Sequence, residues 1–379
     1  MKKILKISSL FLLLGIISCS DEDRDPVISN NGIALKVPVS GTDYVFTPER
    51  AGENALTLVW DRADYGMATQ ATYAIEIAET GTDFAEPLSA VVATDVLGSN
   101  TTYTWKVGYI NQLLNDIGFA PCESMSIDVR IKSTLGLNPE KAQIQYSNPL
   151  TLSIKPYSLA LPLMAFATSA GNAAAAPKVA SSGVLKTDYE GYMWLTPGTY
   201  KFYTPNECAQ FETPTGSYGD NGNGSFDTLV LNAGDGYEIT TAGFYLVKAD
   251  TDPTKLKYSV RLINWNIFGA AKPNFPNANT PLAYNATTKL WETDFVLSNG
   301  YDFQFRSNGT GENALVLGGF DATKTGLDFA GSIMSYKGKA IEVPGGPKSV
   351  PRVNKRYHIA LDLNSPRNYK FSIVENPLP

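Results

Sequence analysis

The feature that most constrains the fold is a series of short segments in which apolar and polar residues alternate. In Ala71–Ala78, for example, Tyr73, Ile75 and Ile77 would lie on one face, and Ser126–Lys132 alternates in the same way. Alternation with a period of two is typical of β-strands that bury one face. Further segments of this kind are Ala55–Trp60, Thr102–Val107 and Ile144–Ile154.

These segments predict an all-β chain that begins with a β-sandwich of the immunoglobulin or fibronectin III type, over residues 27–156. One short helix, over residues 107–119, interrupts the strands. We expect core positions for Trp60 and Trp105. The composition agrees, because aromatic residues reach 11% and the 32 glycines and 23 prolines are spread along the chain as turn residues would be.

A faint internal repeat follows. Residues 244–260 resemble residues 357–373, since each segment reads as a strand, a turn with Asp and Pro, and a second strand. Upstream of these segments, Gly198–Tyr203 mirrors Gly300–Arg306. The repeat predicts two further all-β domains, at residues 157–256 and 257–379, and therefore tandem β-sandwiches.

The N-terminus predicts export. Residues 1–18 combine a basic start with a short apolar run, which is typical of a signal peptide. The sequence Ile-Ile-Ser-Cys ending at Cys19 resembles the box of bacterial lipoproteins and predicts lipidation of this cysteine. The acidic stretch at residues 19–26 predicts a tether that displays the protein on the outer face of an outer membrane. The alternatives are an ordinary signal peptide with an incidental cysteine, and a generic linker.

The other two cysteines, Cys122 and Cys208, lie in different predicted domains. We expect two separate buried thiols, and a disulfide is the alternative in an exported protein.

Composition argues against several classes of function. His358 is the only histidine, so neither a catalytic triad nor a multi-histidine metal site is expected. A formal net charge of −6 without a basic cluster argues against nucleic-acid binding. After the N-terminus, no apolar run reaches membrane-spanning length. We predict no cofactor.

No local motif indicates an enzyme. Asp220–Asp227 has the composition of a calcium loop, but Leu231 stands where such a loop needs a glutamate. Ser217 lies between glycines without the strand–turn–helix context of a nucleophile. Both segments are interpreted as turns. No signature marks the carboxylate pair of a glycosidase, and we predict no catalytic and no metal-binding residue.

Sugar binding needs flat aromatic side chains for stacking and a few planar polar groups for the hydroxyls. The last predicted domain offers Phe275 on a loop, with Arg306 and Asn308 at the end of a strand. The alternative is that Phe275 caps the core and that Arg306 is solvated.

The middle predicted domain offers Trp194, with Lys201 and Tyr203 on the strand that follows it. A core position is the first interpretation for this tryptophan, and sugar stacking is the second.

Several motifs occur in one order along the chain. They are the lipoprotein box with its acidic tail, Leu56–Ala63, Trp265–Ala270, Tyr284–Trp291, Phe303–Arg306 and the closing hairpin with Asp, Pro and Tyr. Together they resemble the SusE/SusF family of starch-utilisation-system outer-membrane lipoproteins, and the resemblance covers nearly the whole chain.

The resemblance implies a surface lipoprotein with an N-terminal immunoglobulin-like domain and two starch-binding-module-like sandwiches. It implies no catalytic activity, and a place near a TonB-dependent transporter and its substrate-binding lipoprotein partner. The family's loop aromatic falls at Phe275, its cation at Arg306 and its amide at Asn308. The full set of carbohydrate-binding candidates is Phe275, Arg306, Asn308, Trp265, Trp194, Lys201 and Tyr203.

We therefore predict a non-catalytic glycan-binding lipoprotein at the cell surface, which holds an oligo- or polysaccharide by stacking and polar contacts. The first alternative is a structural or protein-interaction lipoprotein that docks a TonB-dependent transporter complex. The second alternative is a surface glycosidase.

Overall fold

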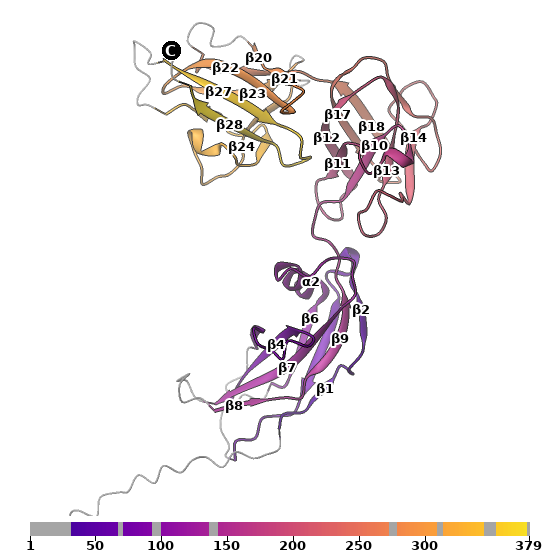
Figure 1. The fold of residues 1–379 in the computed structure, drawn as a ribbon, viewed down its shortest axis with the longest axis vertical. Helices are drawn as coiled ribbons and strands as arrows, with labels where there is room; N and C mark the ends of the chain where they lie inside the picture. The colour runs from indigo at the N-terminus through magenta and orange to yellow at the C-terminus, as the bar shows by residue number, and fades with distance from the viewer. Residues whose placement is uncertain are drawn as a thin grey trace, which may run out of the picture. The chain divides into compact units, whose positions relative to one another are not determined.

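The computed structural model describes residues 32–66, 71–92, 100–135, 143–272, 279–308, 314–344 and 354–376. Cys19 and Phe275 therefore lie outside the described residues. The chain divides into two compact units, Met1–Tyr157 and Ser158–Pro379. Both units are built from β-sheets (Figure 1), which confirms the predicted fold class of tandem β-sandwiches. Each unit is described by itself below.

The first unit contains two sheets and one α-helix among its described residues. One sheet has the order β1 (Leu35–Val37), β3 (Asn54–Trp60), β6 (Thr102–Lys106). The other has the order β2 (Asp43–Val45), β9 (Leu150–Lys155), β7 (Met125–Leu135), β4 (Thr72–Glu79), β5 (Leu88–Val92), and β8 (Gln143–Tyr146) also pairs with β7. A 3-10 turn, η1 (Pro48–Arg50), precedes β3.

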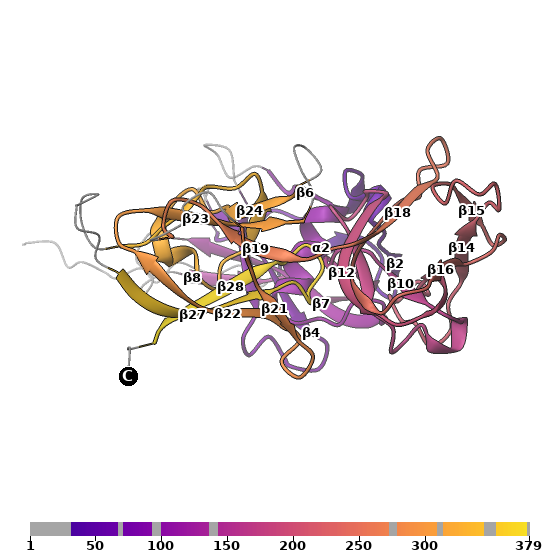
Figure 2. The ribbon, with the colours of Figure 1, turned by 90° about the horizontal axis from the view of Figure 1, so that it is seen from above.

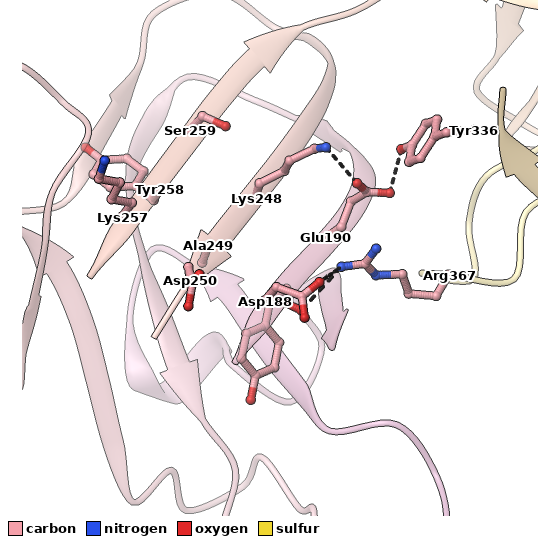
Figure 3. A pocket seen from close by; sticks show the side chains of 11 residues that line it. Asp188, Glu190, Lys248, Ala249, Asp250, Lys257, Tyr258, Ser259, Tyr336 and Arg367 are labelled. Atoms are coloured by element: carbon pink, nitrogen blue, oxygen red, sulfur yellow. Dashed lines mark hydrogen bonds and ion pairs between the residues drawn. The ribbon is translucent and has the colours of Figure 1, made fainter. Parts of the chain in front are cut away.

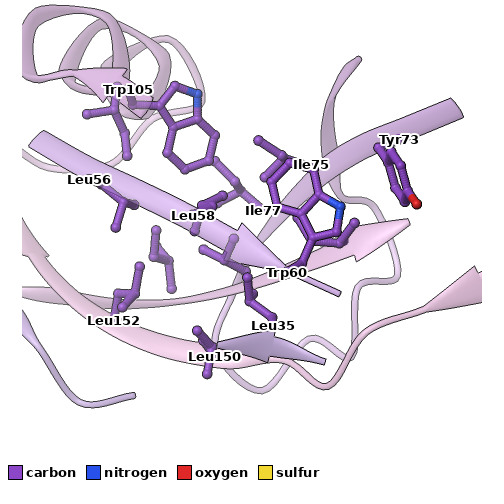
Figure 4. Close-up of a cluster of buried hydrophobic side chains, with 14 of the residues drawn as sticks. Leu35, Leu56, Leu58, Trp60, Tyr73, Ile75, Ile77, Trp105, Leu150 and Leu152 are labelled. Atoms are coloured by element: carbon purple, nitrogen blue, oxygen red, sulfur yellow. The ribbon is translucent and has the colours of Figure 1, made fainter. Parts of the chain in front are cut away.

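The core of the first unit forms where the inward faces of the two sheets meet (Figure 4). Strand β3 contributes Leu56, Leu58 and Trp60, and the facing strand β4 contributes Ile75 and Ile77, as their alternation predicts. The core positions predicted for Trp60 and Trp105 are confirmed, because both indoles are buried. Burial of such large apolar side chains is the main favourable term in folding.

Helix α2 (Val107–Asp116) ends slightly before the predicted residue 119. Gly118 adopts a left-handed conformation and its N–H donates to the Asn115 carbonyl, while the Phe119 N–H donates to the Leu114 carbonyl. This pair of hydrogen bonds is a Schellman cap, which satisfies the last carbonyls of a helix and stops it.

The second unit contains two halves with the same strand order. In the first half, the sheet has the order β15 (Leu229–Leu231), β14 (Gly216–Asp220), β13 (Gly198–Thr204), β10 (Leu163–Ala167), β11 (Lys178–Ser181), β12 (Asp188–Leu195), β17 (Gly243–Asp250), β18 (Lys257–Leu262). Strand β16 (Tyr237–Ile239) also pairs with β13. A 3-10 turn, η2 (Ala170–Asn172), lies between β10 and β11.

The second half repeats this order in two sheets. Figure 2 labels several of its strands, among them β19, β22, β23 and β27. One sheet is β25 (Met334–Tyr336), β24 (Val316–Gly319), β23 (Asp302–Ser307), β19 (Trp265–Phe268), β20 (Thr280–Pro281), with β26 (Ile341–Glu342) on β23. The other is β21 (Ala283–Asn285), β22 (Leu290–Ser298), β27 (Asn354–Asp362), β28 (Lys370–Glu375), and η4 (Gly326–Phe329) precedes β25. Strands β20 and β21 together occupy the place of β11.

The first half ends later in the chain than the predicted boundary at residues 256/257. Strand β18 pairs with β17 along its whole length, from Lys257 opposite Asp250 to Leu262 opposite Tyr245. The segment after residue 256 therefore completes the hairpin of the first half, and the second half starts after Leu262.

The two halves of the second unit also share a core. Tyr192 and Phe244, from strands β12 and β17 of the first half, are buried in one cluster with Trp265, Trp291 and Phe303 of the second half. Their neighbours on the other face of the same strands belong to the core of the first half. Strands β12 and β17 thus bury both faces, which makes the second unit one body.

The expectation of two separate buried thiols is wrong. Cys122 and Cys208 are both disulfide-bonded, and both lie half-buried in loops rather than in a core. A cysteine that is partly accessible on a loop can be oxidised to a disulfide in an oxidising compartment outside the cytosol.

Candidate functional site

The second unit has two hollows of similar size, and each draws residues from both of its halves. The first, called the charged hollow, has a volume of about 440 Å³ (Figure 3). Its lining residues are Asp188, Tyr189, Glu190, Lys248, Ala249, Asp250, Lys257, Tyr258, Ser259, Tyr336 and Arg367.

Glu190 is the centre of the charged hollow. Its carboxylate is buried on β12 and accepts hydrogen bonds from the Tyr336 hydroxyl at 2.5 Å and the Tyr369 hydroxyl at 3.0 Å. The Lys248 Nζ atom lies 2.8 Å from its other oxygen. Because two tyrosines of the second half and one lysine of the first half satisfy the carboxylate, it can be buried at an acceptable cost.

The tyrosines around Glu190 are held in their neutral form. Burial, and then the neighbouring carboxylate, raise the pKa of Tyr369 and of Tyr192 well above the usual range. Burial also raises the pKa of Tyr336. A second contact across the halves joins Arg367 to Asp188, with 2.7 Å between the guanidinium nitrogen and the carboxylate oxygen. The groups around Glu190 and Asp188 therefore bind one another and join the two halves, as in a structural joint.

The second hollow, called the aromatic hollow, also has a volume of about 440 Å³. Its lining residues are Ala175, Pro177, Lys178, Tyr192, Met193, Trp194, Tyr284, Ala286, Lys289 and Asn364. Trp194 is on β12 of the first half, and Tyr284 is on β21 of the second half.

The rings of Trp194 and Tyr284 are stacked. Their centroids are 5.0 Å apart and their planes differ by 7°. Tyr284 in turn packs on Phe244 at 5.0 Å and on Trp291 at 5.6 Å, measured between centroids. Trp194 is therefore the outermost ring of an aromatic stack that is anchored in the core, and 45% of its surface stays exposed.

A tight turn beside the stack positions polar groups at the hollow. The Asn285 carboxamide oxygen accepts the N–H groups of Thr287 and Thr288, and the Lys289 N–H donates to the Asn285 carbonyl at 2.7 Å. The Asn364 carboxamide donates to the Lys289 carbonyl at 3.0 Å. This turn is held at several points, so the Lys289 and Asn364 side chains start from fixed backbone positions.

The arrangement of the aromatic hollow suits a flat, hydroxyl-bearing ligand. A preformed aromatic ring offers contact area at a low entropic cost, because it is ordered before the ligand arrives. Cations and a carboxamide at the rim can hydrogen-bond hydroxyl or anionic groups.

Of the predicted residues, Trp194 lies in the aromatic hollow. Trp265 is fully buried in the shared core, and this contradicts its predicted contact with sugar, since no ring face is open. Trp265 was predicted as part of a strand-loop motif, and its strand β19 turns the indole inward.

Arg306 and Asn308 occupy the end of β23. The Arg306 guanidinium lies over the Phe268 ring, 4.8 Å from its centroid. The Asn308 carboxamide accepts the Asn264 N–H at 3.0 Å and donates to the Leu262 carbonyl at 3.3 Å. Both side chains thus have partners within the protein.

Lys201 and Tyr203 do not line the aromatic hollow. The Lys201 Nζ atom donates to the Gly234 carbonyl at 2.6 Å. Tyr203 packs on a small cluster around Ala173 and Phe211. The structure brings Trp194 together with Tyr284, Lys289 and Asn364 instead, none of which was a predicted site residue.

Among the described residues, no group of three or more His, Cys, Asp or Glu side chains could hold a metal ion. In the same part of the chain, no helix has the length and apolar character needed to cross a membrane.

Fold and site together define a multi-sandwich protein with a partly exposed aromatic cluster where two repeated halves meet. The model of the SusE outer membrane protein family matches residues 21–132. The resemblance to SusE predicted from the sequence is thus confirmed over that segment.

A search of solved structures finds SusF from Bacteroides thetaiotaomicron. It is 12% identical, with a TM-score of 0.26, and the match covers 91% of this chain and 77% of that chain. No curated protein matches the chain.

Proposed function

We propose that the chain is a non-catalytic, glycan-binding lipoprotein of an outer-membrane polysaccharide uptake system. Cys19 would carry the lipid anchor, and the protein would face the cell exterior beside a TonB-dependent transporter. The match of residues 21–132 to a family of outer membrane proteins supports the location. The observation that carries the binding function is the exposed Trp194 ring, stacked on Tyr284 at the aromatic hollow.

In the proposed complex, one face of a pyranose ring packs on the exposed part of Trp194. Asn364 and Lys289 hydrogen-bond its hydroxyl groups. Stacking of this kind contributes about 1 kcal/mol beyond the buried area, and each polar contact contributes about 1 kcal/mol. Binding by one hollow is therefore weak, and several lipoproteins on one surface would raise the apparent affinity for a polymer through avidity.

The test is a panel of polysaccharides titrated against the full chain, the Trp194→Ala variant and a control. Tyr109→Ala is a suitable control, because Tyr109 lies in the first unit and is 52% exposed, close to the 45% of Trp194. We expect one polysaccharide to bind the full chain and the control equally and the Trp194 variant at least tenfold more weakly. If no polysaccharide binds the full chain, the proposal is wrong.

A second candidate function, docking of a protein partner, is favoured by one observation in the first unit. Val37, Val39 and Val45 are all exposed, on or near the short strands β1 and β2. Strand β2 is at the edge of its sheet, and an exposed apolar edge can accept a strand from another chain. The double variant Val39→Glu and Val45→Glu should abolish capture of transporter components by the full chain if this candidate is correct.

A further inference from the structure

The charged residues that line the aromatic hollow are all cationic. They are Lys178 and Lys289, and among the residues that the structure describes no Asp or Glu lines the hollow. This is unexpected for a protein whose formal net charge is −6. The local excess of positive charge therefore needs a reason of its own.

Lys178 enters the hollow from β11 and is held by neutral groups. Its Nζ atom donates to the carbonyls of Ala173 at 2.9 Å and Ala174 at 3.0 Å, and also to that of Ala176. It lies 4.7 Å from the centroid of the Phe211 ring. Burial lowers the pKa of Lys178, and Glu212 opposes this effect. The carbonyls orient the ammonium group but do not cancel its net charge.

Lys289 is exposed at the end of the turn that Asn285 organises. Among the described residues, neither Lys289 nor Lys178 takes part in an ion pair. Two acids, Glu292 and Asp362, hydrogen-bond to residues of the turn and of the hollow, but neither of them lines the hollow. Glu292 accepts from Asn285 at 3.0 Å and from Thr288 at 2.7 Å, and Asp362 accepts from Asn364 at 2.8 Å.

We propose that the aromatic hollow selects an acidic glycan, in which a carboxylate or sulfate group sits beside the sugar ring that stacks on Trp194. The inference rests on the proposed function and names the ligand class of that site. Lys289 contacts the anionic group directly, and Lys178 contributes a second positive charge deeper in the hollow. Charge-assisted hydrogen bonds of this kind are stronger than those to neutral hydroxyls.

The net negative charge of the protein opposes the binding of an acidic ligand. An acidic protein repels an acidic polymer over long range, so a preference for an acidic ligand must come from the local cations. Its affinity should then fall as salt is added, because salt screens the interaction with the exposed Lys289.

The test uses calorimetric titration of the full chain with two pairs of ligands. One pair is an oligogalacturonate and its methyl ester, which share a backbone and differ in charge. The other pair is a sulfated dextran oligosaccharide and the unsulfated one. We expect at least tenfold tighter binding of the acidic member of one pair, and the pair that shows it identifies carboxylate or sulfate.

Variants of two lysines test whether the preference for an acidic ligand arises at the aromatic hollow. Lys289→Gln should weaken binding of the acidic ligand threefold to tenfold, while Lys289→Arg keeps it within about twofold, since the charge is retained. Lys339→Gln is the matched control, because it removes one exposed lysine of the same unit that does not line the hollow.

The outcomes separate the two proposals. If neutral and acidic members bind equally, or if Lys289→Gln matches the Lys339→Gln control, the inference of an acidic ligand is overturned and the glycan-binding function stands. If neither these ligands nor neutral polysaccharides bind the full chain, the proposed function fails, and the inference fails with it.

Discussion

The Trp194 indole lies parallel to the Tyr284 ring, with 7° between their planes and 5.0 Å between their centroids. One ring belongs to the first half of the second unit and the other to the second half. Neither half holds the complete stack alone. The aromatic hollow is therefore a property of the joined pair.

The stack predicts that Tyr284 acts by supporting Trp194. Tyr284→Phe keeps the ring, and we expect affinity for the glycan within about twofold of the full chain. Tyr284→Ala removes the support and leaves Trp194 free to change rotamer, so affinity should fall about tenfold, equivalent to about 1.4 kcal/mol. Calorimetric titration of both variants checks this, and an unchanged affinity in Tyr284→Ala would show that the support is unnecessary.

The joint around Glu190 predicts a large effect on stability. Glu190→Ala leaves Lys248 without its ion-pair partner and two tyrosine hydroxyls without an acceptor. We expect a loss of about 3 kcal/mol in the free energy of unfolding of the second unit, measured with urea. Glu238→Ala, which removes an exposed carboxylate of the same unit, should change it by less than about 0.5 kcal/mol. Equal losses in the two variants would contradict the joint.

The buried tyrosines of that joint predict sensitivity to alkali. Burial raises the pKa of Tyr192, Tyr336 and Tyr369 in the folded protein. Their stabilising effect is present below the unfolded pKa of about 10, and is lost as the pH rises above it, because the unfolded state then releases protons that the folded state keeps. The loss is about 1.4 kcal/mol per pH unit for each such tyrosine.

Urea unfolding at pH 9 and pH 11 measures this effect. We expect the second unit to be clearly less stable at pH 11 than at pH 9. The loss between the two pH values should be smaller in the Tyr336→Phe variant, which has one fewer titrating group. A free energy of unfolding that stays level between the two values would rule out the buried, neutral tyrosines.

An arginine of the first unit predicts a separate stability effect. Arg130 lies 4.0 Å from the ring centroids of both Phe84 and Tyr146, and pairs with the buried Glu76 at 2.7 Å. Arg130→Ala should cost about 3 kcal/mol, because Glu76 keeps only the longer contact to Lys132. Arg130→Lys should restore little, since lysine cannot stack and pair at once.

A matched ion pair serves as the control. Arg50 and Glu53 are 2.8 Å apart but exposed, so Arg50→Ala should cost less than about 1 kcal/mol. If Arg130→Ala lowers the free energy of unfolding in urea no more than Arg50→Ala does, Arg130 does not stabilise the first unit as proposed.

The strands of the first unit could be predicted from sequence because large apolar residues alternate in them with polar or small residues. Strand β4, for instance, shows Tyr73, Ile75 and Ile77 at alternate positions, and this pattern needs no knowledge of the partner strand. The helix end differed by a few residues, because a Schellman cap at Gly118 decides it locally.

The aromatic hollow was harder to predict, because β12 buries both faces. Tyr192 packs in the shared core and Met193 in the core of the first half, so consecutive apolar residues hide the alternation. The pattern therefore does not reveal that Trp194 is half-exposed. Tyr284 comes from a distant segment, and only the joining of the two halves brings it to Trp194.

The most direct test of the central claim uses the position of the tryptophans. All but one of the five are at most 4% exposed, and the exception is Trp194 at 45%. Quenching of the intrinsic fluorescence by acrylamide therefore reports on Trp194. We predict that saturating glycan protects the quenchable fraction in the full chain, and that Trp194→Ala lacks this fraction altogether. Quenching that is unchanged by a glycan that binds would contradict the account, because the sugar would then lie somewhere other than on Trp194.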